Sequence, residues 1–241
     1  MLTLTRRALM ASAAALAFAR PSFAAPTMDA ATEAKLKTLL AGGQRSAANK
    51  ARDPHRHPLE TLKFFGLNQN MTVLEVAPGG GWWREFLQPL LEGGGKYVGA
   101  NFNPTGQPIE PGTADLVLTF RNMHNWMGGG EAKDMFGVMF KSLKPGGYLG
   151  IEEHRAAATA PQDPKAPMGY VREDYAIQLI ESAGFKLVAK SEVNANPKDT
   201  KDYPKGVWTL PPTFQEGDKD RAKFAAIGES DRFTLLFQKP A

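Results

Sequence analysis

The chain has 241 residues, of which 42% are hydrophobic, 22% charged and 10% aromatic. These values exclude collagen-like, coiled-coil and broadly disordered chains, and the absence of cysteine excludes a disulfide scaffold, a cysteine nucleophile and a thiolate metal site. The formal net charge is +4, but Arg6, Arg7 and Arg20 lie in a segment without acidic residues. Removal of those three arginines leaves +1, which does not favour nucleic acid or anionic lipid as a partner.

Residues 1–24 have the features of a signal peptide. Arg6 and Arg7 precede an apolar stretch at 8–19, and small residues at Ser22 and Ala24 predict cleavage before Ala25. The apolar stretch is shorter than the roughly 20 residues that span a bilayer, so no membrane span is expected after cleavage. The paired arginines favour the twin-arginine route over a plain secretory signal. We therefore expect a periplasmic or otherwise exported protein.

The pattern after the signal predicts a helical extension at 25–66 and an α/β domain at 67–241. In the extension, one helix is expected at 29–41 and a shorter one begins near Pro58. Strands are then expected at 71–76, 96–100, 115–120, 148–152, 185–190 and 232–238, and helices at 82–91, 132–143 and 172–183. This alternation predicts a Rossmann-like, doubly wound and mostly parallel sheet. Because no helical pattern connects the last two strands, the C-terminal strand is expected to be an antiparallel edge strand.

A glycine-rich turn follows the first expected strand. The sequence there is Val73-Leu74-Glu75-Val76-Ala77-Pro78-Gly79-Gly80-Gly81-Trp82. Glycines at this position let the backbone approach a ligand closely, and the next helix offers free N–H donors. The turn therefore predicts a site for a nucleotide-like ligand, with a purely structural turn as the alternative.

These motifs, in this order, resemble class I S-adenosylmethionine-dependent methyltransferases. The residues from Glu75 to Gly81 look like the first motif of that family, residues 118–126 like the fourth-strand motif, and residues 143–147 and 182–185 like the turns before later strands. The segments Arg56-His57-Pro58 and 228–232 also look like those of a group of predicted exported bacterial methyltransferases. The resemblance implies S-adenosylmethionine as the cofactor. The residues that it implies for cofactor binding are Glu75, Ala77, Pro78, Gly79, Gly80, Gly81, Trp82, Asn101, Phe102, Asn122 and Met123.

Two positions depart from the family pattern. Ala77 replaces the first glycine of the turn, a small change that a tight loop can absorb. Asn101 replaces the acidic residue that binds the ribose hydroxyls in the family. Because its amide is neutral, a charge-assisted hydrogen bond to the ribose is lost. That loss is worth about tenfold in affinity. Weakened cofactor binding is therefore expected.

Candidate catalytic groups follow the expected strands at their carboxyl ends. His124 has the ordinary pKa for a general base, with loop hydrogen bonding as the alternative. Glu153 and His154, together with Glu152, end the fourth of these strands, where either acceptor contact or salt bridging is possible. Trp82, Phe102 and Trp126 are candidates for an aromatic wall around a sulfonium, or for plain packing. The histidine spacing matches no metal motif, so no metal is expected.

Two further segments have two interpretations each. The segment of His55, Arg56 and His57 either covers the cofactor and binds an anionic acceptor, or stabilises a helix end through salt bridges. Residues 194–220 form either a lid over the acceptor or a surface loop held by its aromatic residues.

The leading functional interpretation is methyl transfer from S-adenosylmethionine to a small organic acceptor. Because this cofactor is made in the cytoplasm, the alternative is a non-catalytic exported binding module that keeps the fold and holds a nucleoside or another small ligand. A nicotinamide-dependent oxidoreductase fits the turn spacing less well. A nucleic-acid partner is not expected, because the chain has no basic stripe.

Overall fold

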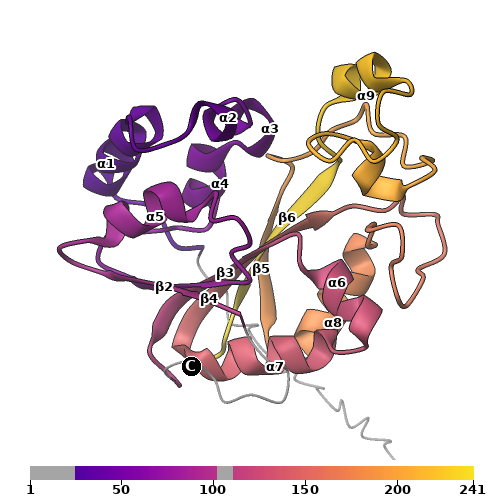
Figure 1. Ribbon diagram of the computed structural model, residues 1–241. Coiled ribbons are helices and arrows are strands. Elements are labelled where there is room, and N and C mark those ends of the chain that lie inside the picture. Colours follow the sequence, from indigo (N-terminus) through magenta and orange to yellow (C-terminus); the bar gives the residue numbers. More distant parts are fainter. Residues whose placement is uncertain (1–24, 102–110) are drawn as a thin grey trace, which may run out of the picture.

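The computed structural model describes residues 25–101 and 111–241, and these form one sheet with helices on both faces (Figure 1). The strands are β1 (Thr72–Val76), β2 (Lys96–Ala100), β3 (Ala114–Phe120), β4 (Leu143–His154), β5 (Lys186–Ser191) and β6 (Arg232–Gln238). The helices before the sheet are α1 (Ala30–Ala41), α2 (Ala47–Lys50), α3 (Asp53–Arg56) and α4 (Pro58–Phe64). The others are α5 (Arg84–Leu91), α6 (Met123–Gly129), α7 (Ala132–Ser142), α8 (Glu173–Ser182), the 3-10 helix η1 (Gly206–Thr209) and α9 (Arg221–Ile227).

The strand order is β2-β1-β3-β4-β6-β5. The first four strands pair in parallel, and β6 pairs antiparallel with both β4 and β5. The expected Rossmann-like, mostly parallel sheet with an antiparallel C-terminal strand is therefore confirmed. One detail differs, because β6 lies inside the sheet and β5 forms its edge. The cause is burial: β6 carries six consecutive buried residues, whereas β5 exposes lysines that suit an edge.

Each face of the sheet has its own apolar core. Along β1, Val73 packs on one face with α1, α4 and α5, while Leu74 packs on the other with α6, α7 and α8. Because successive side chains point to opposite faces of a strand, β1 contributes to both cores. The helices of residues 25–66 therefore share a core with the sheet, through Leu36, Leu62 and Phe65.

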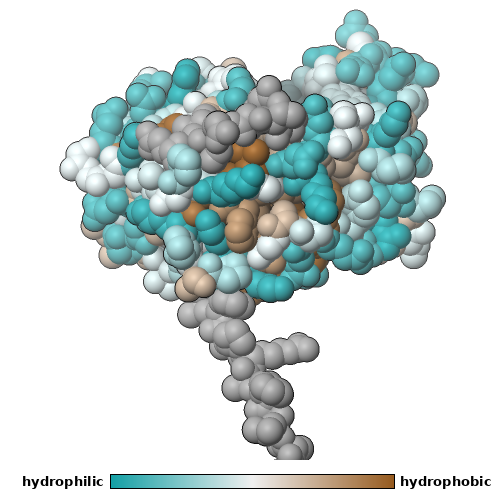
Figure 2. All heavy atoms as spheres, turned by 90° about the horizontal axis from the view of Figure 1, so that it is seen from below, coloured by the Kyte–Doolittle hydropathy of each residue, from teal (hydrophilic) through white to brown (hydrophobic). Residues whose placement is uncertain are grey.

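Apolar side chains are well covered in the described part of the chain. Met168, 42% exposed, is the one large apolar residue classed as exposed there. Figure 2 shows the molecule from below, where most residues are hydrophilic and apolar residues gather near the centre of the view. Among residues 25–101 and 111–241, no helix is long and apolar enough to cross a membrane.

The topology determines where a ligand site can form. The parallel strands β1, β3 and β4 end together at one rim of the sheet, near the loop that carries η1 and α9 in the upper right of Figure 1. In open α/β sheets, ligands bind at this rim. The residues that follow these strands are Ala77, Arg121 and Arg155.

Candidate functional site

The glycine turn after β1 adopts a left-handed backbone at three positions. Ala77, Gly79 and Gly81 have φ values of 52°, 53° and 76°. Side chains on Gly79 or Gly80 would meet no atom within 4 Å in the protein, so open space lies directly over this backbone. Ala77 takes the conformation that glycine adopts without cost, and its N–H donates to the carbonyl of Ala100 at 2.8 Å.

Asn122 holds the turn from the neighbouring strand end. Its Nδ2 donates to the carbonyls of Val76 and Ala77 at 3.2 and 3.3 Å and to Thr119 Oγ1 at 3.1 Å. Asn122, which was expected to bind the cofactor, thus uses its side-chain amide to fix the shape of the turn. Asn122 also lines the cavity above the turn.

A cavity of about 290 Å³ lies over the glycine turn, and we call it the turn cavity. Its lining residues include Glu75, Ala77, Pro78, Gly79, Gly80, Trp82, Trp83, Phe120 and Asn122. Of the turn residues that were expected to bind the cofactor, all except Gly81 line this cavity. The volume is close to the lower limit of about 300 Å³ for small-molecule sites.

Glu75 presents a carboxyl group with an unusual acidity to this cavity. The residue is 1% exposed, and its Oε2 accepts a hydrogen bond from Tyr97 Oη at 2.7 Å. Burial raises the pKa of Glu75 to about 7, although the Tyr97 hydrogen bond opposes this shift. The group is therefore partly protonated near neutrality and can donate or accept a hydrogen bond there.

The aromatic residues divide between the cavity and the core. Trp82 lines the turn cavity, but its Nε1 donates to the carbonyl of Asn49 at 2.9 Å and its ring lies under Arg56. Trp83, which sequence reasoning missed, stacks on Phe120 with ring centroids 4.0 Å apart. Its Nε1 is buried with no hydrogen-bond partner among the described residues.

For Trp126 the structure favours the packing alternative, and Met123 packs beside it. Both side chains belong to the apolar core under α6, where Trp126 packs edge-on against Phe136 with centroids 6.0 Å apart. Their spacing explains this, because Met123, Trp126 and Met127 recur at helical intervals and form the buried face of α6.

The segment after β2 gives only a partial result. Asn101 is exposed at the carboxyl end of β2, next to the strand that enters the glycine turn. Phe102 lies outside the described residues, as does the expected signal peptide at 1–24.

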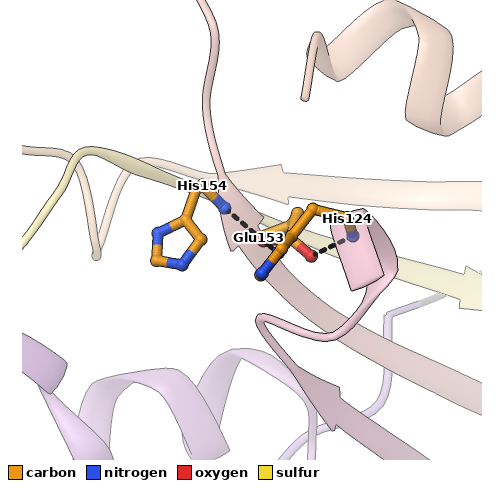
Figure 3. Close-up of side chains that lie close together, drawn as sticks. All are labelled: His124, Glu153 and His154. Carbon is orange, nitrogen blue, oxygen red and sulfur yellow. Dashed lines mark hydrogen bonds and ion pairs between the residues drawn. The ribbon is translucent and has the colours of Figure 1, made fainter. Parts of the chain in front are cut away.

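The three predicted catalytic residues lie together beside the turn cavity. Figure 3 shows Glu153, from the end of β4, between His124 of α6 and its own neighbour His154. One Glu153 oxygen lies 3.0 Å from His124 Nδ1 and accepts from the backbone N–H of His154 at 2.8 Å. The other accepts from the backbone N–H of His124 at 3.2 Å. The carboxylate is fully buried and fully bonded, so it orients His124 and is not itself exposed to an acceptor.

The two histidines have opposite acid–base properties. Burial opposes charge on His124, but the Glu153 carboxylate outweighs it and raises the pKa of His124 above its ordinary value. Burial lowers the pKa of His154 well below its ordinary value, and the neighbouring His124 and Arg121 add to this effect. His154 Nδ1 is 2.5 Å from Ser230 Oγ. His154 is therefore neutral near pH 7, while the Glu153 carboxylate favours the protonated form of His124.

These three residues also form the type of cluster that can hold a metal ion. Their ligand atoms lie within 4.8 Å of one another. However, Arg121 repels positive charge at both histidines: it adds to the lowered pKa of His154 and opposes the raised pKa of His124. A cationic neighbour of this kind disfavours a metal ion.

A second cavity of about 320 Å³ lies in front of the histidines, and we call it the histidine cavity. Its lining includes His124, His154 and Ser230 on one side and Trp208, Pro211 and Pro212 of the 194–220 loop on the other. The His124 and Trp208 rings meet edge-on with centroids 5.7 Å apart. The aromatic loop thus forms one wall of this cavity.

Glu229 is a central residue that sequence reasoning did not assign. It is 5% exposed, and its Oε1 accepts from Arg52 Nε at 2.7 Å. Its Oε2 accepts from Arg232 Nη1 at 3.3 Å and from Arg56 Nε at 3.4 Å. Although burial opposes its charge, Arg232 and Arg56 lower the pKa of Glu229 to about 2. The segments 56–58 and 228–232, which carried part of the resemblance, thus meet through this carboxylate.

Comparisons with known proteins show what fold this is. A SAM dependent methyltransferase from Aquifex aeolicus is similar at 17% identity, with 86% of this chain and 98% of that chain covered and a TM-score of 0.54. The [4+2]-cyclase SpnF is similar at 15% identity, with 90% and 97% covered and a TM-score of 0.53. A phosphoethanolamine N-methyltransferase 2 from Haemonchus contortus is similar at 14% identity, with 86% and 61% covered and a TM-score of 0.50.

No protein-family model matches the sequence, and no curated protein matches it either. The likeness to these structures, at such low identity, is a likeness of fold. The chain therefore has the Rossmann-like fold found in SAM-dependent methyltransferases.

Proposed function

We propose that this protein transfers a methyl group from S-adenosylmethionine to a small organic acceptor. The observation that carries the proposal is the pair of cavities at the carboxyl ends of β1, β3 and β4. The turn cavity lies over an exposed glycine backbone, and the histidine cavity contains a carboxylate-oriented imidazole. Arg52, Arg56 and Arg121 line both cavities, so the two spaces adjoin.

The residues of the turn cavity fit such a cofactor. Gly79 and Gly80 leave open space that any side chain would fill. The Glu75 carboxyl and the unpaired Trp83 Nε1 are polar groups that can orient a ligand in an otherwise restricted space. S-adenosylmethionine supplies an electrophilic methyl group when bound. The protein's own contribution is then to align the acceptor and remove its proton.

His124 is the residue that we assign as general base. Because its Nδ1 is bonded to the Glu153 carboxylate, the neutral ring carries its proton on Nδ1 and leaves Nε2 free to accept one. His124 lines the histidine cavity, so Nε2 can take a proton from a hydroxyl or acidic carbon of the acceptor. Glu153 then stabilises the imidazolium that forms. In this scheme Glu153 is a positioning residue and His154 is a neutral wall of the cavity.

The proposal includes export, with residues 1–24 as a twin-arginine-like signal. This route carries folded proteins, so a cofactor-loaded chain can reach the new compartment. The competing function is an exported binding module without turnover. Asn101, at the position where the resembled family has an acid, is the observation that favours this module.

Single-turnover assays separate the two functions. The full chain is incubated with S-adenosylmethionine carrying a labelled methyl group and a panel of small hydroxylated and acidic acceptors. Release of S-adenosylhomocysteine with label on an acceptor supports the methyltransferase. Cofactor binding without product from any acceptor supports the module, and failure to bind the cofactor contradicts the methyltransferase.

A further inference from the structure

Three arginines lie where the two cavities adjoin. Arg52 lies between α2 and α3, Arg56 ends α3, and Arg121 directly follows β3. All three line the turn cavity and the histidine cavity. The fold therefore brings positive charge from two distant segments to one point.

The three guanidinium groups are only partly bonded. Arg52 and Arg56 each donate one hydrogen bond, through Nε, to Glu229. Arg121 Nη1 is 3.6 Å from Glu229, and its Nε is 4.0 Å from Glu152, so both are beyond hydrogen-bond distance. Within the described residues, the Nη groups of all three make no hydrogen bond. Since a guanidinium has five N–H donors, most of their donors remain available to a ligand.

Structural arginines elsewhere in the chain look different. Arg45 donates to both oxygens of Asp53 and to the carbonyl of Leu40. Arg155 bonds both oxygens of Glu192 and both of Asp231. Arg45 and Arg155 therefore use more of their donors than the three cavity arginines do, although the Nε of Arg45 is also buried without a partner.

Positive charge also exceeds negative charge around these arginines. Glu229 and Glu152 face four guanidinium groups, because Arg232 bonds both carboxylates as well. Arg56 is 3% exposed, and burial together with the nearby Arg121 lowers its pKa to about 8. A buried charge without a full partner is costly, so an anion in the cavity would relieve this cost.

The backbone of Arg121 carries a further sign of function. Its φ is +59°, a left-handed conformation that is costly for a residue other than glycine. Its N–H donates to the carbonyl of Glu152 at 2.7 Å. Such strained residues cluster at ligand sites.

We propose that Arg52, Arg56 and Arg121 bind an anionic oxyacid group, a carboxylate or phosphate, on the methyl acceptor. This inference rests on the proposed function and specifies its substrate class. The planar guanidinium group of arginine can donate two parallel hydrogen bonds to a carboxylate or a phosphate. Trp208 and Pro211 give the histidine cavity an apolar wall that can contact the remainder of the acceptor. A cationic amine acceptor is disfavoured by the same charge. The acceptor is therefore a small organic acid or phosphoester whose reacting atom lies near His124.

The first test is calorimetry on the full chain saturated with S-adenosylhomocysteine, at constant ionic strength. Inorganic phosphate and benzoate are the anionic probes, and tetramethylammonium is the cationic control. We expect at least one anion to bind and the cation not to bind. Arg121→Gln and Arg52→Gln should each weaken anion binding by about tenfold or more, the worth of a charge-assisted hydrogen bond. Arg172→Gln, at a half-buried arginine that lines neither cavity, removes the same charge and should have no effect.

The methionine end of the cofactor is a second source of a carboxylate, and the same variants distinguish it. Unchanged S-adenosylhomocysteine affinity in Arg121→Gln, with anion binding reduced, assigns the arginines to the acceptor. Competition between phosphate and S-adenosylhomocysteine, with Arg121→Gln weakening S-adenosylhomocysteine but not 5′-methylthioadenosine, assigns them to the cofactor and overturns the proposal.

Failure of the two proposals is distinguishable. A chain that does not bind S-adenosylhomocysteine contradicts the proposed function. A chain that binds it but binds neither anion, or binds them equally well in both arginine variants, contradicts only the inference about the acceptor. Melting curves of each variant establish that it is folded.

Discussion

The buried pair of His124 and Glu153 should contribute to the free energy of unfolding by an amount that depends on pH. In Glu153→Gln the side chain keeps its shape, but the charge that holds His124 Nδ1 at 3.0 Å is lost. In the wild type, the two carboxylate oxygens accept from the backbone N–H groups of His124 and His154. The variant replaces one of these acceptors by an amide N–H₂ group, which cannot accept. A hydrogen bond to a charged group is worth about 1.5–3 kcal/mol, so we expect the free energy of unfolding to fall by about 2 kcal/mol at pH 6.

The sign of the pH dependence follows from the raised pKa of His124. A histidine whose pKa is higher in the folded state than the ordinary 6.5 stabilises the fold fully below pH 6.5. That contribution is lost as the pH rises through the folded-state pKa. The difference between wild type and Glu153→Gln should therefore be largest at pH 6 and clearly smaller at pH 9.

Chemical denaturation of the full chain at pH 6 and pH 9 measures this difference. For a protein of this size, 2 kcal/mol corresponds to a melting-temperature change of roughly 4–8 °C. Glu192→Gln is the matched control, because Glu192 is exposed and its ion pair with Arg155 is worth about 0–1 kcal/mol. An equal loss at both pH values, or no loss at pH 6, would refute the charged pair.

Three further variants test other parts of the site. His124→Ala should lower single-turnover methyl transfer by about 10²–10⁴-fold and leave S-adenosylhomocysteine affinity unchanged; retained activity in a calorimetrically normal variant would end the assignment as base. Asn101→Asp should tighten cofactor binding about tenfold by calorimetry, through a restored charge-assisted hydrogen bond, and unchanged affinity would show that Asn101 does not contact the ribose. Ala77→Gly should raise the free energy of unfolding by about 0.5–1 kcal/mol, because glycine tolerates the observed φ of 52°, and a destabilised variant would contradict that backbone conformation.

Local sequence patterns predicted two strands closely, whereas β4 begins at Leu143, inside the expected turn at 143–147, and is longer than the expected strand at 148–152. The expected strand at 96–100 has the bounds of β2, and the expected strand at 115–120 differs from β3 by one residue. Short apolar runs bounded by glycine and proline determine these elements locally. The position of β6 between β4 and β5 was not accessible in this way, because strand pairing depends on contacts far apart in the sequence.

The site was predictable only where a residue directly follows a strand. The glycine turn and His124 come shortly after strands, and Glu153 and His154 are the last residues of β4, so these groups meet at one rim. The contact of Glu229 with Arg52 was missed, because it joins positions 177 residues apart and no local pattern signals it. An arginine immediately after a buried strand, as at Arg121, was the available signal for the cationic side of the site.

The central claim is that the glycine turn forms the cofactor site, and calorimetric titration of the full chain with S-adenosylhomocysteine tests it most directly. Gly79→Val would place its side chain in the open space above the turn, whereas Gly93→Val introduces a comparable left-handed valine remote from both cavities. The account predicts that wild type and Gly93→Val bind with similar affinity and that a folded Gly79→Val does not bind. Equal binding by all three chains would contradict it.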